Sequence, residues 1–366
     1  MAMHYVHKRY ARWLTFLILA EMTFLVSTSL YLDPVVGDMT RLGGFAENDY
    51  GWNQPQKVFE KQPSPLQEGY DHYADIVVVG DSFSCAGLCG TPNSPWQTFL
   101  TAETGYSTVT LSHYTHTEPP TYDASLLPKI ITGDSFQKRP PRILIAEFVE
   151  RQLDILPDVG GDCGIINPYK NKPDFRPSPI TLPMRDAYRI HNRTPLNEQL
   201  PYARKYWLER MKRTIKDSYT PVRQMELTAA ALFSSKASNR LLVYEGDIKK
   251  KSWDEKRIAD IQCKLAKLRN LVQQNGKTLF LTLIAPDKLS AYSAYLQDPS
   301  YAKTSVIDRL ASDKSLHIVR VDQAMRAAVA EGTVDLYLPN DTHWGYRGHQ
   351  TAAAAITRYL ESFTGD

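Results

Sequence analysis

The chain opens with an apolar segment long enough to cross a membrane. Trp13 to Leu32 is a mainly apolar run in which Glu21 is the one charged residue, and three basic residues lie just before it, within Lys8–Arg12. Twenty helical residues rise about 30 Å, the thickness of a bilayer core. A cleavable signal peptide would have a shorter apolar core ending in an A-x-A-like site, and no such site is evident after Ser29. The pattern favours an uncleaved signal anchor over residues 1–33, with the basic flank in the cytoplasm and the body outside.

The hydrophobic pattern then changes twice. Residues 34–73 are rich in Pro and Gly without periodicity, which predicts an irregular stalk. From residue 74 onward, strands and helices alternate. Apolar runs predict buried strands at 75–79, 106–111, 142–149, 278–284 and 316–321. Helical spacing and capping residues predict helices at 94–104, 122–131, 254–276, 306–310 and about 348–363. This alternation predicts an α/β fold, a mostly parallel sheet with helices on both faces.

The alternation stops between residues 152 and 253. Residues 152–200 are rich in Gly, Pro and Asn, and two helical patterns follow at 202–216 and 221–235. We interpret this stretch as a helical and irregular insertion in a catalytic domain that runs from residue 74 to 366. It would serve as a lid or as a partner interface.

Composition narrows the function classes. The formal net charge is +3, from 43 basic and 40 acidic side chains, and the sequence has no run of five basic residues. Nucleic-acid binding is therefore not indicated. The four cysteines lack the spacing of a zinc site, and we predict neither metal nor cofactor. Outside the cytoplasm they are expected to form one or two disulfides.

The first candidate for chemistry is Gly80-Asp81-Ser82-Phe83-Ser84, directly after the predicted strand 75–79. A serine on a sharp turn that leaves a strand exposes its hydroxyl, and its N–H can face a developing oxyanion. The same residue types also form ordinary turns. Gly133-Asp134-Ser135-Phe136 repeats four of the letters, but it lies just before a strand, so we interpret that copy as a loop. The context favours Ser82 as a nucleophile.

The second candidate is Asp341-Thr342-His343-Trp344, close to the start of the last predicted helix. A neutral histidine can take the proton of a serine and later return it. A carboxylate two residues earlier can fix its tautomer and stabilise the imidazolium. Ligand sites in parallel sheets lie at the carboxyl ends of the strands, where distant segments can meet. The sequence predicts a triad of Ser82, His343 and Asp341.

Together the two blocks resemble the SGNH hydrolases, with a G-D-S block and a later D-x-H block. They are similar in detail to the proteins that O-acetylate alginate and bacterial cellulose, which carry G-[DT]-S-[FY]-S and a D-x-H-W followed by Gly, here Gly348. A strand ending in E-R resembles Glu147–Arg151, and a P-x-K-x-x-x-Y segment resembles Pro286–Tyr292. The resemblance covers most of residues 74–151 and 254–363.

This sequence departs from those families in two ways. In the alginate proteins the D-x-H block precedes the Ser block, whereas here it follows. The sequence also has no clear G-x-N-D block, the usual source of an oxyanion-hole Asn in SGNH hydrolases, so the N–H of Ser82 is the expected oxyanion donor.

The resemblance implies an SGNH/flavodoxin-like fold and an O-acetyltransferase. Ser82 would form an acyl-enzyme, His343 would be the general base and Asp341 its orienting carboxylate. The acceptor would be a hydroxyl of an exported cell-surface polysaccharide, and the acyl donor would come from a membrane-bound O-acyltransferase. The resemblance places the chain in the inner membrane as a single-pass protein, with its catalytic domain in the periplasm.

Other residues are candidates for oxyanion or substrate contacts. They are Gly80, Asp81, Arg151, Lys288, Tyr292 and Trp344. Arg151 would lie near the site or form a salt bridge with Glu147 or Glu150. Lys288 and Tyr292 would contact a polysaccharide or lie in a solvated loop. Cys85 and Cys89 are interpreted as structural, since neither occupies the nucleophile position.

Two alternatives to the transferase stay open. An esterase would use the same triad with water as the acceptor. A non-catalytic envelope assembly subunit would keep the fold without the reaction.

Overall fold

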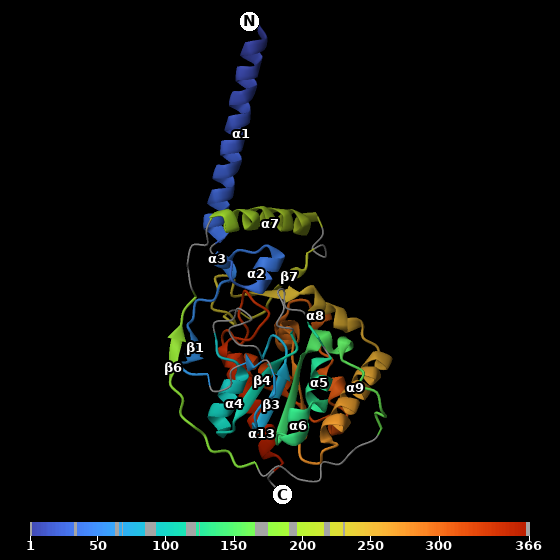
Figure 1. Ribbon diagram of the computed structural model, residues 1–366. Coiled ribbons are helices and arrows are strands. Elements are labelled where there is room, and N and C mark those ends of the chain that lie inside the picture. Colours follow the sequence, from blue (N-terminus) through green and yellow to red (C-terminus); the bar gives the residue numbers. More distant parts are fainter. Residues whose placement is uncertain are drawn as a thin grey trace.

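The protein consists of a long N-terminal helix and a folded body (Figure 1). The computed structural model describes residues 2–32, 35–62, 66–67, 69–84, 93–114, 122–123, 125–164, 175–189, 196–215, 220–229 and 231–363. Helix α1 (Ala2–Leu32) extends away from the body, and its segment His7–Leu32 is long and apolar enough to span a membrane. By these criteria a retained anchor and a signal sequence look alike. Cys85 and Cys89, for which the sequence predicted a structural role, lie outside the described residues.

A parallel sheet forms the centre of the body. In the described part of the chain it has six strands in the order β10-β9-β5-β3-β4-β2. The strands are β2 (Leu66–Gln67), β3 (Ile76–Gly80), β4 (Thr108–Ser112), β5 (Ile143–Val149), β9 (Leu279–Ala285) and β10 (Ile318–Val319). Every residue of β3, β5 and β9 is buried, because both faces of the sheet are covered. The predicted α/β fold is confirmed.

Alternate residues of the strands pack into two apolar cores. Ile76 and Val78 face one core, and Val77 and Val79 face the other. The first core contains α4 (Trp96–Thr104), α12 (Val321–Ala330) and α13 (Tyr346–Glu361). The second contains α5 (Leu126–Thr132), α6 (Asp134–Lys138), α9 (Glu255–Gln273) and α11 (Ile307–Leu310). The short helices α10 (Lys288–Tyr292), η4 (Ser293–Tyr295) and η5 (Pro299–Tyr301) pack on the first core, and η6 (Lys314–Leu316) adds Leu316 to the second.

Two local predictions around the sheet were wrong. The strand expected at 316–321 is reduced to β10, because α12 begins at Val321 and buries Val321, Met325 and Val329. The second Gly-Asp-Ser-Phe copy was expected to be a loop, but α6 begins at Asp134, and Phe136 packs into the core.

The segment predicted to be an irregular stalk has regular structure and packs on the body. It contains α2 (Asp38–Gly43), α3 (Glu47–Tyr50) and β1 (Gln56–Phe59). The carboxylate of Glu47 is buried and accepts hydrogen bonds from the N–H groups of Val36 and Gly37 and from the amide of Asn340. Polar capping of this kind leaves no hydrophobic periodicity, so the pattern of the sequence missed it.

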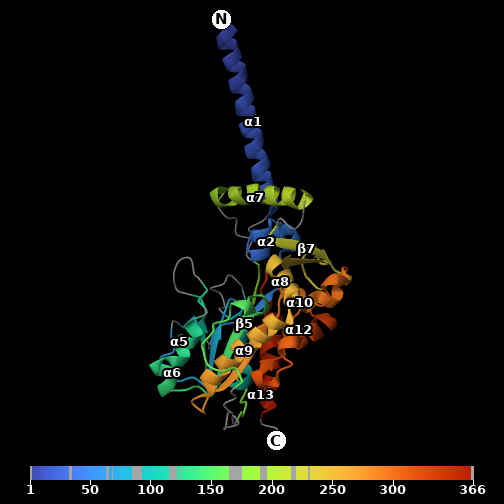
Figure 2. The same cartoon turned by 90° about the vertical axis from the view of Figure 1, so that its right-hand side faces the viewer.

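The predicted insertion contains β6 (Met184–Ala187), α7 (Leu196–Ile215), β7 (Val222–Glu226), β8 (Arg240–Tyr244) and α8 (Glu245–Lys249), with short helices η1 (Glu150–Ile155) and η3 (Lys250–Ser252) at its ends. The helix expected at 202–216 corresponds to α7. The helix expected at 221–235 was wrong, because β7 pairs with β8 in an antiparallel ribbon. Figures 1 and 2 both show α7 lying across the base of α1, with α2 directly beneath it.

Candidate functional site

The turn that carries Ser82 follows the last residue of β3 and is supported from below by two buried carboxyl groups. Asp81 accepts hydrogen bonds from the N–H of Phe83 and of Val149, each 2.9 Å long. Glu147 accepts from the N–H of Asp81 and from the hydroxyl of Ser84, each at 2.8 Å. Asp81 therefore shapes the turn from inside the protein, whereas the sequence suggested a contact with the substrate.

Gly80 is needed at the start of this turn for space. A Cβ atom there would lie 2.3 Å from Oγ of Ser84 and 2.7 Å from Oε2 of Glu147, well inside van der Waals contact. Burial, followed by the charge of Asp81, raises the pKa of Glu147 well above its ordinary value. Glu147 therefore holds its proton more tightly than a solvated glutamate does.

The loop before α13 holds the predicted base and its carboxylate. Nδ1 of His343 lies 2.5 Å from Oδ1 of Asp341, which also accepts the N–H of His343 at 3.0 Å. An ionised carboxylate only accepts, so Nδ1 carries the hydrogen and Nε2 the lone pair. Nε2 is buried and has no hydrogen-bond partner among the described residues. The ring of Phe83 lies 5.0 Å from that of His343, so the serine turn and the histidine loop meet.

The charges of this loop are tightly coupled. Burial opposes protonation of His343, but the charge and hydrogen bond of Asp341 and the charge of Asp38 outweigh it and raise the pKa of His343. Burial alone would raise the pKa of Asp341, yet the interactions with His343 lower it to about 2. The ionised Asp341 therefore stabilises the imidazolium that forms when Nε2 of His343 takes a proton, as general-base catalysis requires.

Asp38 is a site residue that the sequence did not reveal. Its N–H donates to Oδ2 of Asp341 at 3.0 Å, and its carboxylate accepts the N–H of Thr342 at 2.8 Å. Its Oδ2 lies 4.0 Å from Nδ1 of His343. Burial and the charge of Asp341 raise the pKa of Asp38 to about 6. The residue comes from the N-terminal end of α2, about 300 positions from the histidine, and a lone Asp in a Pro- and Gly-rich stretch gave no signal.

Tyr114 is a second residue that the sequence missed. It follows β4, the neighbour of β3 in the sheet, and its hydroxyl is hydrogen-bonded to the side chain of Ser82. Burial and the charge of Asp81 raise the pKa of Tyr114 to about 12, so the phenol keeps its proton. Its position just after a strand was the one sign in the sequence, because ligand sites in parallel sheets lie at the carboxyl ends of the strands.

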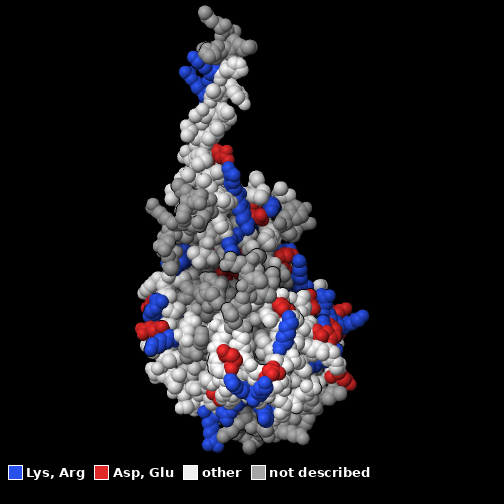
Figure 3. Space-filling model, viewed as in Figure 1, with Lys and Arg blue, Asp and Glu red and all other residues white. Residues whose placement is uncertain are grey.

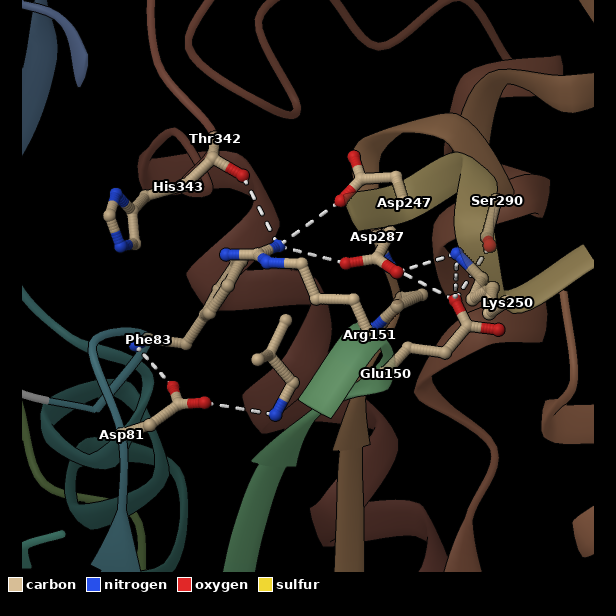
Figure 4. A network of polar contacts seen from close by, with 12 residues as sticks. Asp81, Phe83, Glu150, Arg151, Asp247, Lys250, Asp287, Ser290, Thr342 and His343 are labelled. Atoms are coloured by element: carbon tan, nitrogen blue, oxygen red, sulfur yellow. Dashed lines mark hydrogen bonds and ion pairs between the residues drawn. The ribbon is translucent and has the colours of Figure 1, made fainter. Parts of the chain in front are cut away.

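Arg151 reaches the loop of Asp341 and His343 from the end of β5. Its guanidinium donates to Asp287 at 2.8 Å, and to Asp247 and the hydroxyl of Thr342 at 3.4 Å each (Figure 4). The predicted salt bridge with Glu147 or Glu150 was wrong. Burial disfavours the charged form, but the charges of Asp247 and Asp287 prevail and raise the pKa of Arg151. A permanent positive charge is therefore fixed beside the residue that precedes His343.

The aspartates that hold Arg151 belong to a buried ionic network. Lys250 pairs with Asp287 at 2.5 Å and with Glu150 at 3.3 Å, and all three side chains are inaccessible to solvent. Glu150 also accepts hydrogen bonds from Ser290, from Ser305 and from two backbone N–H groups. Each charge has its partners, which is the condition for keeping ions inside a protein.

Lys288, Tyr292 and Trp344 lie behind the catalytic loop and are fully buried. The ammonium of Lys288 donates to the carbonyl oxygens of Leu338, Pro339 and Asp341 at 2.8–3.1 Å. The ring of Trp344 packs 4.8 Å from that of Phe83, and the hydroxyl of Tyr292 accepts the N–H of Tyr337. These three residues support the loop from within, and the burial of Lys288 and Tyr292 shows that they do not lie in a solvated loop.

The structure also places the second Gly-Asp-Ser-Phe copy and a group of side chains with the spacing of metal ligands. Ile143 pairs with Ile76 at the amino ends of β5 and β3, so the second Gly-Asp-Ser-Phe copy, just before β5, lies at the edge of the sheet opposite Ser82. Asp38, Asp341 and His343 form the described group with the spacing of metal ligands. The 2.5 Å contact between Asp341 and His343 has the geometry of a charge-assisted hydrogen bond.

Comparison with known proteins confirms the resemblance over part of the chain. Residues 196–364 match the sequence model of the SGNH hydrolase-like domain of the acetyltransferase AlgX. No curated protein and no solved structure matches the chain. The match contains Asp341 and His343, whereas Ser82 and Arg151 precede it. It also includes residues 196–253, which the sequence suggested were an insertion outside the resemblance. The chain thus carries an AlgX-like SGNH acetyltransferase domain.

Proposed function

We propose that this protein is a membrane-anchored O-acetyltransferase that modifies hydroxyl groups of an exported polysaccharide through an acyl-enzyme at Ser82. The observation that carries the proposal is the pairing of His343 with Asp341 beside the serine turn, with Nε2 of the histidine directed away from the carboxylate. The AlgX-like match over the histidine loop supports acetyl transfer as the reaction class.

In the first half-reaction, Oγ of Ser82 attacks the acetyl carbonyl as Nε2 of His343 takes its proton. Asp341 holds the ring and stabilises the imidazolium. The tetrahedral intermediate then collapses, and the imidazolium returns the proton to the leaving group of the donor. In the second half-reaction a sugar hydroxyl gives its proton to Nε2 and attacks the acetyl-serine, and Ser82 recovers its proton as the ester leaves.

The intermediate needs donors for its oxyanion. The N–H of Ser82, at the end of a strand, is the first of these. The protonated hydroxyl of Tyr114, next to Ser82, is a second donor, and the charge of Arg151 stabilises negative charge in the site at longer range. An SGNH-type Asn is thereby replaced by groups that this chain supplies from β4 and β5.

The position of the site suits a donor that arrives at the membrane. Asp38, which contacts both Asp341 and Thr342, comes six residues after the end of α1 at Leu32. The site thus lies on the side of the body from which α1 leaves (Figure 1). If α1 stays in the membrane as an anchor, a membrane-bound O-acyltransferase could deliver acetyl groups without a diffusing carrier.

The proposal is tested with the full-length protein in detergent or nanodiscs, using a chromogenic acetyl ester and oligosaccharide acceptors. Ser82→Ala should abolish ester turnover and acceptor acetylation. Ser135→Ala, in the second Gly-Asp-Ser-Phe copy, is the matched control and should keep wild-type rates. Turnover that depends on Ser82 but yields acetate alone with every acceptor would favour the esterase. Equal turnover in wild type and Ser82→Ala would refute the acyl-enzyme.

A further inference from the structure

Helix α7 has an apolar stripe that the body does not use. Leu208, Met211 and Ile215 are spaced at i, i+3 and i+7, so they share one side of the helix, and their exposed fractions are 49%, 57% and 77%. The opposite side is buried: Ala203 and Tyr206 pack against Leu25 and other residues near the end of α1. Three large apolar side chains facing water on one helix imply a partner.

The geometry relative to α1 identifies the kind of partner. Both views show α7 perpendicular to α1 (Figures 1 and 2), so if α1 crosses a bilayer, α7 lies parallel to its surface. The crossing is fixed by side chains. The ring of Trp207 lies 5.1 Å from that of Phe24, and its indole N–H donates to Thr28 at 3.1 Å. Arg204 lies 3.5 Å from Glu21, the one acidic residue of the apolar run.

The length of α1 then sets the depth of α7. From Arg9 to Leu25, which packs against α7, the helix rises about 24 Å. The hydrocarbon core of a bilayer is about 30 Å thick. If the hydrocarbon core of the bilayer begins near the basic residues at the free end of α1, it therefore extends at least to the level of α7. Figure 3 shows α1 as an uncharged stretch between basic side chains near its free end and charged groups where it meets the body.

The charge of this region complements anionic lipid. Helix α7 has five basic and two acidic residues in its sequence. Together with the body it borders an open hollow of about 570 Å³, which Tyr31 near the end of α1 also lines. The lining includes the cationic side chains Arg210, Arg213, Lys236 and Arg240, and among the described lining residues Asp49 supplies the one carboxylate. Interfacial helices combine an apolar stripe with such basic residues.

We propose that α7 is an interfacial helix that embeds Leu208, Met211 and Ile215 in the surface of a bilayer containing anionic phospholipid. Its exposed basic residues, which include Arg204 and Arg210, meet the lipid phosphates at the surface of the bilayer. The helix, together with α1, holds the body at one height and orientation, with α2 and the catalytic loop facing the membrane. This inference rests on the proposed retention of α1 as an anchor.

The test uses the full-length protein reconstituted in vesicles of phosphatidylethanolamine and phosphatidylglycerol. An environment-sensitive fluorescent amino acid is encoded at Met211, and in a matched variant at Ser362, which is exposed near the C-terminal end of the body, far from α7. Bromine in the acyl chains quenches a fluorophore that enters the bilayer. We expect quenching several-fold stronger at Met211 than at Ser362, with a blue-shifted emission at Met211 that weakens when phosphatidylcholine replaces phosphatidylglycerol.

The outcomes distinguish failure of the anchor from failure of the interfacial helix. If carbonate washing extracts the protein from the vesicles, the anchor fails, and the inference about α7 fails with it. If the protein resists extraction but Met211 emits as Ser362 does and is quenched no more strongly, α1 is an anchor and the interfacial helix is refuted, leaving the stripe for a protein partner. Equal quenching in both lipid mixtures would refute the role of anionic lipid.

Discussion

Asp38 offers the sharpest test of the site, because its carboxylate lies beside the histidine without being the group that orients it. In Asp38→Asn, the side-chain oxygen still accepts the N–H of Thr342, and the backbone N–H still donates to Asp341. The substitution therefore removes one negative charge, 4.0 Å from Nδ1 of His343, with little change of shape. We expect slower catalysis because the imidazolium that forms during proton transfer loses part of its stabilisation.

The expected loss follows from Coulomb's law. Two unit charges 4.0 Å apart attract by about 1 kcal/mol in water and by about 4 kcal/mol at an effective dielectric constant near 20. The Asp38 side chain is 20% exposed, so solvent screens it and the lower half of this range applies. A loss of about 1–2 kcal/mol lowers kcat/KM by about 5- to 30-fold.

The dependence on pH distinguishes a charge effect from a structural one. The carboxyl of Asp38 is ionised only above a pKa of about 6, so the neutral Asn imitates the protonated form below that pH. The ratio of wild-type to variant kcat/KM, measured with an acetyl ester, should be largest near pH 8 and approach one below pH 6. Asp49→Asn, on the neighbouring α3, is the control and should keep a ratio near one throughout. A ratio for Asp38→Asn that stays constant with pH, or equals one at pH 8, would refute the argument.

Further predictions concern the buried groups around the site. Lys288→Met should lower ester turnover tenfold or more, because three loop carbonyls lose their donor. Its Tm should change little, since an apolar side chain avoids the cost of burying an ammonium. A large fall in Tm with unchanged turnover of the folded enzyme would contradict this. The raised pKa of Glu147 means that the folded protein keeps a proton that the unfolded chain releases above pH 4.5, so stability falls as pH rises, and Glu147→Gln should remove this slope in urea unfolding between pH 5 and 8. Burial, and a hydrogen bond that the Cys263 thiol donates to Cys163, raise the pKa of Cys263 to about 11. Both thiols are free in the structure, and we expect these neighbours to form a disulfide after export, detected as a linked peptide by non-reducing mass spectrometry. Separate reduced peptides from exported protein would argue against it.

The sequence predicted the sheet well because its strands are buried on both sides. Runs such as Ile76–Val79 and Leu279–Ile284 contain no polar alternation, and that is the pattern of a central parallel strand. Edge and surface elements were predicted poorly. The segment 221–235 has apolar residues at helical spacing, yet its first part forms β7, which pairs with β8 about 20 positions away. Val222 of β7 and Leu242 of β8 are buried in one cluster, and this packing overrides the local preference for a helix.

The candidate site divides in a similar way. Ser82 and the pair Asp341 and His343 became candidates because short motifs lie at the ends of predicted elements, and spacing alone places the carboxylate next to the ring. Lys288 and Asp81 were also found, but their roles changed, since whether a polar side chain faces solvent or the interior depends on tertiary packing that a motif does not encode. The partners of Arg151 could not be named, because Asp247 and Asp287 come from elements about 100 and 140 residues away.

Asp38 was missed for a reason that bears on how the enzyme is organised. The backbone N–H groups of Met39 and Thr40 donate to the carbonyl of Asn340, and a Cβ atom on Gly37 would lie 2.1 Å from that same oxygen. The chain that leaves α1 is thus fitted closely against the loop that holds Asp341 and His343. Helix α1 and the loop of Asp341 and His343 share one packed segment, so a displacement of α1 relative to the body would shift the carboxylate beside the histidine. If α1 stays in the membrane as we propose, the proposed proton-transfer site is coupled mechanically to the membrane, and such a construction is expected where a membrane protein delivers the acyl donor.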